Sequence, residues 1–506
     1  MLFTEPTFLF LFLPILLALY FVTDIARGGR QAGVHGTYGN VLLLVASVIF
    51  YATGGGAFTW LVLASIAFNY WMAIAVDRAG GRSAARRRLA VAVTINLIVL
   101  GVFKYANFIA DNVNALVSAV GLARAPVLNI PRVLLPIGIS FFTFHAISYV
   151  VDVSRRDATA QKSPVHAALY LLLFPQLIAG PIIRYRDIAD QLARRVVTLD
   201  DFAYGIRRFV LGLGKKVLIA NVVASPADRI FAMPVAQLSP AHAWLGLVCY
   251  TFQIYFDFSG YSDMAIGLGR MFGFRFPENF RWPYISSSVQ EFWRRWHISL
   301  STWFRDYLYI PLGGNRVTPA RRYRNLVTVF FLCGLWHGAS WNFVIWGIWH
   351  GAFLVIERVA SPTQLLRWGA APGSSTQDSP RRLIGRVYAH MYTMAVVMLG
   401  WVFFRADSLP ASIAFLKALA GLGPASPAPF TVGFFLTPEL WITLLAAAVG
   451  SMPWVPTLAA RLASRPRSLR DRGLEWLGAA ALAAMLFASI VSVAARTYNP
   501  FIYFRF

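Results

Sequence analysis

Two histidines stand in a stretch of sequence that carries no charged side chain. Residues 326–356 contain no Asp, Glu, Lys or Arg, yet they include His337 and His350, each preceded by tryptophan and followed by glycine. A charge-free run of this length is typical of a membrane span, where an ionisable side chain is costly and marks a functional hypothesis. Imidazole is also the side chain best suited to moving a proton near neutral pH. The stretch therefore indicates proton-transfer chemistry at membrane depth.

The spacing of these histidines argues against a metal site. On one unbroken helix, His337 and His350 would point to roughly opposite sides, because each residue turns the helix by about 100°. No HExxH or other metal-ligand spacing occurs in the chain, and we expect no metal. His350 precedes Glu357 by two helical turns, so these two side chains are predicted to share a face and to pair.

A third histidine, His297, lies in a segment that is both aromatic and basic. The apolar stripe of Trp293, Trp296, Leu300 and Phe304 predicts one helix over Gln290–Tyr309, with Arg294 beside His297 on its surface. A helix of this composition is equally typical of a membrane surface. Its arginines could anchor lipid headgroups or clamp an anionic acyl donor, and they are Arg294, Arg295 and Arg305.

The elements that must position these residues are membrane helices. The chain is 58% hydrophobic and 13% charged, and its mean hydropathy is +0.58. Its successive apolar runs predict an all-α polytopic membrane protein with about 10 to 12 transmembrane or re-entrant helices. We expect a single membrane domain over residues 1–506, with residues 257–325 interfacial or re-entrant and residues 326–356 carrying the histidines.

The net charge and the cysteine content indicate which binding partners and which cysteine chemistry to expect. The net charge of +24 comes from short basic clusters between apolar runs, as in cytoplasmic loops. The bilayer, with its anionic headgroups, is a sufficient partner for them, and no nucleic acid is expected. Cys249 and Cys333 are predicted to be buried free thiols, and His145, in another apolar run, a hydrogen-bonded core histidine.

Sequence blocks spread over nearly the whole chain resemble the membrane-bound O-acyltransferase family, and in particular its bacterial branch that O-acetylates alginate. They are Phe8–Ile15, Leu134–Asp152, Phe174–Tyr185, Phe256–Phe274, Glu291–Asn315, Gly334–Gly351 and the final FIYFRF. The resemblance implies helices around a central funnel, with His337 as the catalytic histidine and His297 as a second polar position. It further implies acetyl-CoA or another acyl thioester as donor, no tightly bound cofactor, and a place in the bacterial inner membrane. Periplasmic acetyltransferase partner proteins and an exported polysaccharide, expected to be alginate, would receive the acetyl group.

The expected reaction places His337 as the base that takes the proton of an acceptor hydroxyl. His297 could orient His337, hydrogen-bond a substrate or stabilise the developing oxyanion. Other family members move D-alanine onto teichoic acids or acetyl groups onto peptidoglycan and cellulose, so the motifs specify the reaction better than the acceptor.

Two alternatives remain open from the sequence. A transporter or flippase of anionic or lipid-linked cargo would also have many spans, but the chain shows no internal repeat and few intramembrane carboxylates. A non-catalytic scaffold of a secretion complex would tolerate the loss of His337.

Overall fold

The computed structural model consists of helices joined by turns and loops, without a strand among the residues that it describes. The structure describes residues 1–506 except 27–35, 123–124, 361–379, 424–425, 427–429, 456, 459–468, 496–497 and 499–506. The chain divides into two compact units, and helices α9 (Leu199–Gly214) and α11 (Pro240–Met271) contribute to both. Each unit is described by itself.

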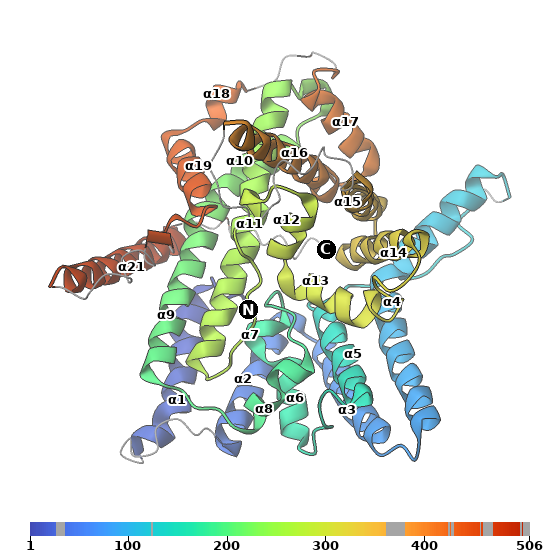
Figure 1. Ribbon diagram of the computed structural model, residues 1–506, viewed down its shortest axis with the longest axis vertical. Coiled ribbons are helices and arrows are strands. Elements are labelled where there is room, and N and C mark those ends of the chain that lie inside the picture. Colours follow the sequence, from blue (N-terminus) through green and yellow to red (C-terminus); the bar gives the residue numbers. More distant parts are fainter. Residues whose placement is uncertain are drawn as a thin grey trace. The chain divides into compact units, whose positions relative to one another are not determined.

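Unit 1 comprises Met1–Phe209 and Ser262–Pro277. Figure 1 shows α3, α4 and α5 of this unit packed side by side. Its other elements are η1 (Phe8–Phe12), α1 (Leu13–Ala26), α2 (Thr37–Gly55), α3 (Phe58–Asp77), α4 (Arg82–Ala119), α5 (Ile139–Arg155), α6 (Pro164–Leu172), α7 (Phe174–Leu177) and α8 (Tyr185–Ala193).

The core of unit 1 combines aromatic packing with a few polar pairs. Phe3, Phe8 and Phe50 are fully buried, and their ring centroids lie 5.0 to 5.9 Å apart. Asn69 of α3 and Asn96 of α4 exchange side-chain hydrogen bonds of 2.7 and 3.1 Å, so the polar groups of these apolar helices satisfy each other. Polar side chains between membrane helices are expected to pair in this way.

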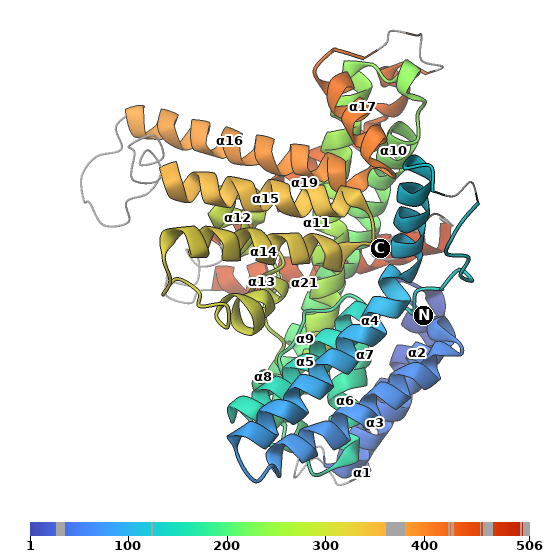
Figure 2. The ribbon, with the colours of Figure 1, turned by 90° about the vertical axis from the view of Figure 1, so that its right-hand side faces the viewer.

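Unit 2 comprises Val210–Tyr261 and Glu278–Phe506. Figure 2 shows its helices α14, α15 and α16 lying side by side. The elements of this unit are η2 (Lys215–Ala220), α10 (Asn221–Phe231), η3 (Val235–Gln237), η4 (Pro283–Ile285), α12 (Val289–Arg295), α13 (Ile298–Phe304), η5 (Arg305–Tyr309), α14 (Pro319–His337), α15 (Trp341–Ala360), α16 (Pro380–Arg405), α17 (Leu409–Leu419), α18 (Val432–Phe435), α19 (Pro438–Gly450) and α21 (Leu469–Ala495).

A buried ion pair joins the two long helices that pass into unit 2. Lys216, in the π-helical turn η2, lies 2.7 Å from Asp257 of α11, and both side chains are almost completely buried. Gly260, one turn after Asp257, approaches so closely that a Cβ there would lie 2.8 Å from the carbonyl oxygen of Gly212. The close packing excludes solvent from the pair, and each charge therefore depends on the other.

Seven helices of the described residues are long and apolar enough to cross a membrane, and three shorter apolar helices are further candidates. This confirms the all-α, multi-pass membrane fold. The total of 10 to 12 spans, the central funnel and the single domain over 1–506 stay predictions. Within residues 257–325, the first part continues α11 to Met271 and is buried, while the placement of the whole segment at the interface stays a prediction. Cys249 and Cys333 are buried free thiols, as predicted.

Candidate active site

His297 lies at a break between two short helices of unit 2. Helix α12 ends at Arg295, α13 begins at Ile298, and His297 itself has a left-handed backbone with φ 42° and ψ 55°. The predicted single helix over Gln290–Tyr309 is therefore wrong. The break is stabilised from outside the segment, because Arg281 N donates to Arg295 O at 2.9 Å and Ile298 N donates to Asn279 O at 2.9 Å. A non-glycine residue keeps such a conformation only where its surroundings impose it.

The side chain of His297 is held in one tautomer. Its Nδ1 lies 3.1 Å from Oδ1 of Asn279, which also accepts a 2.9 Å hydrogen bond from the Ser299 hydroxyl. Because the amide oxygen only accepts, Nδ1 carries the proton and Nε2 carries the lone pair. Among the residues that the structure describes, Nε2 has no hydrogen-bond partner. A buried imidazole that offers a lone pair can accept a hydrogen bond from a hydroxyl group.

Burial keeps His297 neutral. Its side chain is 1% exposed, and the Phe258 ring meets it edge-on at 4.5 Å between centroids. Burial lowers the pKa of His297 from 6.5 to about 3, because the charged form is poorly solvated. The arrangement suits His297 to hydrogen-bond a substrate rather than to store a proton.

His337 lies at the C-terminal end of a helix, whereas His297 directly precedes the start of one. It is the last residue of α14, is 6% exposed, and its ring contacts Trp336, Trp346 and Phe404 at 4.8 to 5.0 Å between centroids. The carbonyl groups at a helix C-terminus favour a positive charge. The end of α14 therefore supports a transient positive charge on His337, whereas His297 lies between the end of α12 and the start of α13, whose effects oppose each other.

A hairpin, not one helix, brings His337 and His350 together. Helix α14 ends at His337 and α15 begins at Trp341, so the unbroken helix assumed from the sequence is wrong. The two helices touch through glycine, since a Cβ at Gly334 would lie 2.2 Å from the carbonyl oxygen of Phe343. Trp346 then lies between the histidines, with its ring centroid 5.0 Å from that of His337 and 5.2 Å from that of His350.

Trp336 links this hairpin to His297. Its ring centroid lies 4.8 Å from that of His337 and 6.1 Å from that of His297. The structure thus brings both predicted catalytic histidines into one aromatic cluster, which we define as His297, Trp336, His337, Trp346 and His350. The indole N–H of Trp346 is buried without an acceptor among the described residues.

His350 and Glu357 do not pair with each other, contrary to the prediction. Nδ1 of His350 accepts a 3.4 Å hydrogen bond from Nε1 of Trp293. The carboxylate of Glu357 instead accepts hydrogen bonds from the backbone N–H groups of Val289 and Gln290, at 2.6 and 3.0 Å. Glu357 therefore fixes the start of α12, the helix that leads to His297.

The three arginines have different surroundings, and no contact described among the resolved residues joins them to the histidines. Arg295 is paired with Glu291 at 2.8 Å and donates to Arg281 O at 3.1 Å. Arg305 is paired with Asp306 at 2.7 Å, although 58% of its side chain is exposed. Arg294 is exposed, and because the helix breaks before His297 the two are not neighbours on one helical surface. Contact of these arginines with donor phosphates stays a prediction.

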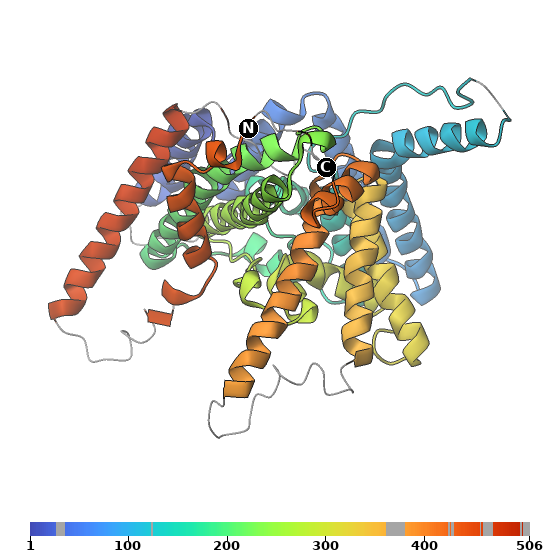
Figure 3. The same cartoon turned by 90° about the horizontal axis from the view of Figure 1, so that it is seen from above.

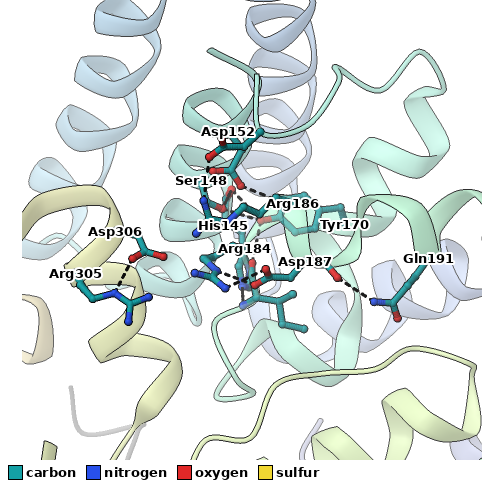
Figure 4. Close-up of polar contacts among 12 residues, drawn as sticks. His145, Ser148, Asp152, Tyr170, Arg184, Arg186, Asp187, Gln191, Arg305 and Asp306 are labelled. Carbon is teal, nitrogen blue, oxygen red and sulfur yellow. Dashed lines mark hydrogen bonds and ion pairs between the residues drawn. The ribbon is translucent and has the colours of Figure 1, made fainter. Parts of the chain in front are cut away.

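A separate buried polar cluster surrounds His145 in unit 1 (Figure 4). Nε2 of His145 accepts a hydrogen bond from Ile183 N at 3.3 Å, and the Tyr170 hydroxyl donates to Ile183 O at 3.0 Å. Asp152 accepts from Arg186 N at 3.1 Å, so the cluster fastens residues 183–186 to α5. His145 is fully buried, which confirms the prediction of a hydrogen-bonded core histidine.

Sequence reasoning missed three residues that shape the cluster. Asn279 fixes the tautomer of His297, Glu357 fixes α12, and Trp346 separates His337 from His350. The first two act across long sequence separations, which no local pattern reveals. Among the described residues, no three His, Cys, Asp or Glu side chains gather as metal ligands would.

The chain is similar in sequence to known acyltransferases, and the similarity includes the histidine cluster. A family model described as the membrane-bound O-acyltransferase family matches residues 94–375, which include all three histidines of the cluster. The protein named probable alginate O-acetylase of Azotobacter vinelandii is 42% identical over 100% of both chains. The peptidoglycan O-acetyltransferase of Helicobacter pylori is 34% identical over 84% of this chain and 81% of its own. The teichoic acid D-alanyltransferase of Bacillus subtilis is 31% identical over 42% of this chain and 55% of its own.

Proposed function

Because the chain belongs to the membrane-bound O-acyltransferase family and is a multi-pass membrane O-acyltransferase, we propose that it transfers acetyl groups for the O-acetylation of exported alginate. The proposal that alginate is the acceptor rests on the full-length similarity to a protein named for alginate O-acetylation. The similarity to the D-alanyltransferase covers less than half of this chain. The proposed setting is the bacterial inner membrane, and the proposed donor is acetyl-CoA or another acyl thioester delivered from the cytoplasm.

The proposed reaction is a direct acyl transfer. The acceptor oxygen attacks the thioester carbonyl carbon, a C–O bond forms, the C–S bond breaks and the thiol leaves. His337 takes the hydroxyl proton and returns it to the leaving thiolate, and its place at the end of α14 supports the transient positive charge. The acetyl ester formed on this acceptor is then the donor for periplasmic acetyltransferase partners, whose transfer regenerates the acceptor hydroxyl and acetylates the polysaccharide.

The tautomer of His297 narrows its proposed role. With Nδ1–H committed to Asn279, Nε2 can accept a hydrogen bond but cannot donate one. The attacking hydroxyl has one proton and gives it to His337, so His297 would hold the acceptor through a second, neighbouring hydroxyl, and it is not suited to stabilise an oxyanion. The buried N–H of Trp346, beside His337, is the better candidate donor to the oxyanion.

The test of the reaction compares purified wild-type protein with His337→Ala, using labelled acetyl-CoA. Loss of a general base typically lowers kcat by about 10² to 10⁴-fold. His242→Gln is the matched control, because His242 is also buried in unit 2 and hydrogen-bonded to Ser239 and Phe430 O. Unchanged kcat in a folded His337→Ala protein would remove His337 from the chemistry.

The test of the acceptor uses a bacterium that makes alginate but lacks its own alginate O-acetylase. Expression of this chain is expected to restore ester-linked acetate on the exported alginate, while His337→Ala is not. Acetate on peptidoglycan with unmodified alginate would replace the alginate proposal by peptidoglycan O-acetylation. This second acceptor has one observation in its favour, the 34% identity over most of the chain to a peptidoglycan O-acetyltransferase.

A further inference from the structure

Unit 2 contains a cavity of about 440 Å³ that the proposed reaction does not use. Four segments line it, and their principal side chains are Thr251 and Phe252 of α11, Tyr284 of η4, Met394 and Met398 of α16, and Met452 after α19. Figure 3 shows the backbone of α11, α16 and α19, the three long helices that contribute residues to the cavity lining. The size is that of a site for a small ligand or part of a larger one.

The polar groups in the cavity wall are bonded within the protein. The Tyr284 hydroxyl donates to Thr251 O at 2.6 Å, and Nδ1 of His390 lies 3.1 Å from Ser286 O. The Ser451 hydroxyl donates to Ala447 O at 2.8 Å. Apart from Nε2 of His390, what remains toward the cavity is hydrocarbon, aromatic rings and methionine thioethers, which adapt to flexible apolar ligands. A polar or charged ligand would lose its hydration here without compensation.

Apolar side chains next to the cavity lining are exposed on two of the helices that contribute to it, α16 and α19. Residues 384–405 of α16 form one of the candidate membrane spans. Its Met391 is 60% exposed, and Leu445 and Val449 of α19 are 64% and 58% exposed. Apolar side chains at such exposure on membrane helices contact acyl chains. Hydrocarbon is therefore the solvent around these two helices.

We propose that this cavity holds one hydrocarbon chain of a bilayer phospholipid as a resident of the folded enzyme. An empty cavity would forfeit the dispersion contacts of its lining, while acyl chains are present at high concentration next to that lining. The bound hydrocarbon chain would also pack against Tyr284, which contacts the segment that holds His297. Tyr284, in the cavity wall, stacks on Phe292 at 6.4 Å and on Trp296 at 6.1 Å, and Trp296 directly precedes His297.

The test fills the cavity from α19. Ala448 lines it, so Ala448→Phe should displace the chain, whereas Leu445→Phe, one turn earlier on the same helix, adds the same ring on the lipid-facing side. Native mass spectrometry of the purified proteins is expected to show one retained phospholipid fewer for Ala448→Phe than for wild type and Leu445→Phe. Photocrosslinking with a phospholipid that carries a diazirine in its acyl chain should label the Met394–Met398 segment at least tenfold less in Ala448→Phe.

The outcomes separate the possible occupants. Equal lipid retention and equal labelling in Ala448→Phe and wild type would overturn the proposal. Labelling of the segment by a diazirine fatty acid but not by the phospholipid would also overturn it. Met398→Trp fills the same cavity from α16 and gives the same measurement if Ala448→Phe does not fold. The experiment measures lipid and not acetyl transfer, so its result is independent of the proposed reaction.

Discussion

His145 in unit 1 and His297 in unit 2 are equally buried, but they offer opposite chemistry. Nε2 of His145 accepts from a backbone N–H, so the remaining nitrogen, Nδ1, carries a proton. Nδ1 of His297 donates to Asn279, so the remaining nitrogen carries a lone pair. Neither remaining nitrogen has a partner among the described residues. The first hydrogen bond, not the depth of burial, decides whether the remaining nitrogen of a buried histidine accepts a hydrogen bond or donates one.

His350 extends the comparison within unit 2. Its Nδ1 accepts from Trp293, which leaves a proton on Nε2, as in the case of His145. Of these three histidines, His297 therefore is the one that presents a base to its surroundings. Substitutions can remove this lone pair, change its protonation or loosen the helix that holds His297.

Among the three histidines His145, His297 and His350, the largest effect is expected from His297→Ala. The substitution removes Nε2 of His297, the nitrogen proposed to accept a hydrogen bond from the substrate. It should lower kcat by roughly 10²-fold, the scale on which one preorganised hydrogen bond acts in catalysis. Acetyl transfer from labelled acetyl-CoA by the detergent-purified variant is the measurement. A folded variant with wild-type kcat would show that the open lone pair has no part in the reaction.

Glu357→Ala should have a smaller effect, about tenfold on kcat, because Glu357 acts through the start of α12 and not on the substrate. A positioning role makes the effects non-additive. Adding Glu357→Ala to His297→Ala should therefore reduce kcat no further, although it lowers thermal stability. Full multiplication of the two losses would contradict the positioning role.

Asn279→Asp should move the pH dependence of kcat. A carboxylate beside Nδ1 stabilises the imidazolium and raises the pKa of His297 from its value of about 3. Below the new pKa Nε2 is protonated and the lone pair is lost, so activity falls as pH falls and the acid limb shifts to higher pH. The rate measured from pH 5 to 9 tests this, with Asn279→Ala as the uncharged comparison. An acid limb that stays in place would refute the assigned contact.

The smallest effect on catalysis is expected from His145→Gln. The substitution disturbs the hydrogen bond to Ile183 N, and a buried polar group left unpaired costs about 1 to 3 kcal/mol of stability. The variant should melt at a lower temperature in detergent, yet its kcat per folded molecule should remain within about twofold of wild type. A loss of kcat comparable to that of His297→Ala would abolish the distinction between the two histidines.

The sequence predicted the helical membrane fold, because apolar length is a local signal. It also singled out His337 as an ionisable group in an apolar run, whereas the catalytic roles of His337 and His297 came from the family resemblance and stay predictions. It did not predict the two helix breaks. The break at His297 depends on hydrogen bonds from residues 279–281, which lie outside the segment. The break after His337 had a local signal that was overlooked, since Gly338 is followed by Ser340, whose hydroxyl accepts from Asn342 N at 3.2 Å at the start of α15.

The partners of the histidines lay beyond any sequence argument. Pairing of His350 with Glu357 followed from helical periodicity, but the carboxylate satisfies two backbone N–H groups of α12 instead. Backbone donors at a helix start compete strongly for a buried carboxylate. Periodicity reports which residues share a face, and it does not report what packs against that face.

The ion pair between Lys216 and Asp257 constrains how the chain is inserted during synthesis. Lys216 lies within the candidate span Leu199–Phe231, and its partner is made later, in α11. A lone charge at the centre of an inserting helix costs about 2.5 to 3.5 kcal/mol on insertion scales. The span Leu199–Phe231 is therefore expected to be held at the insertion machinery until α11 has been made and Asp257 can neutralise Lys216.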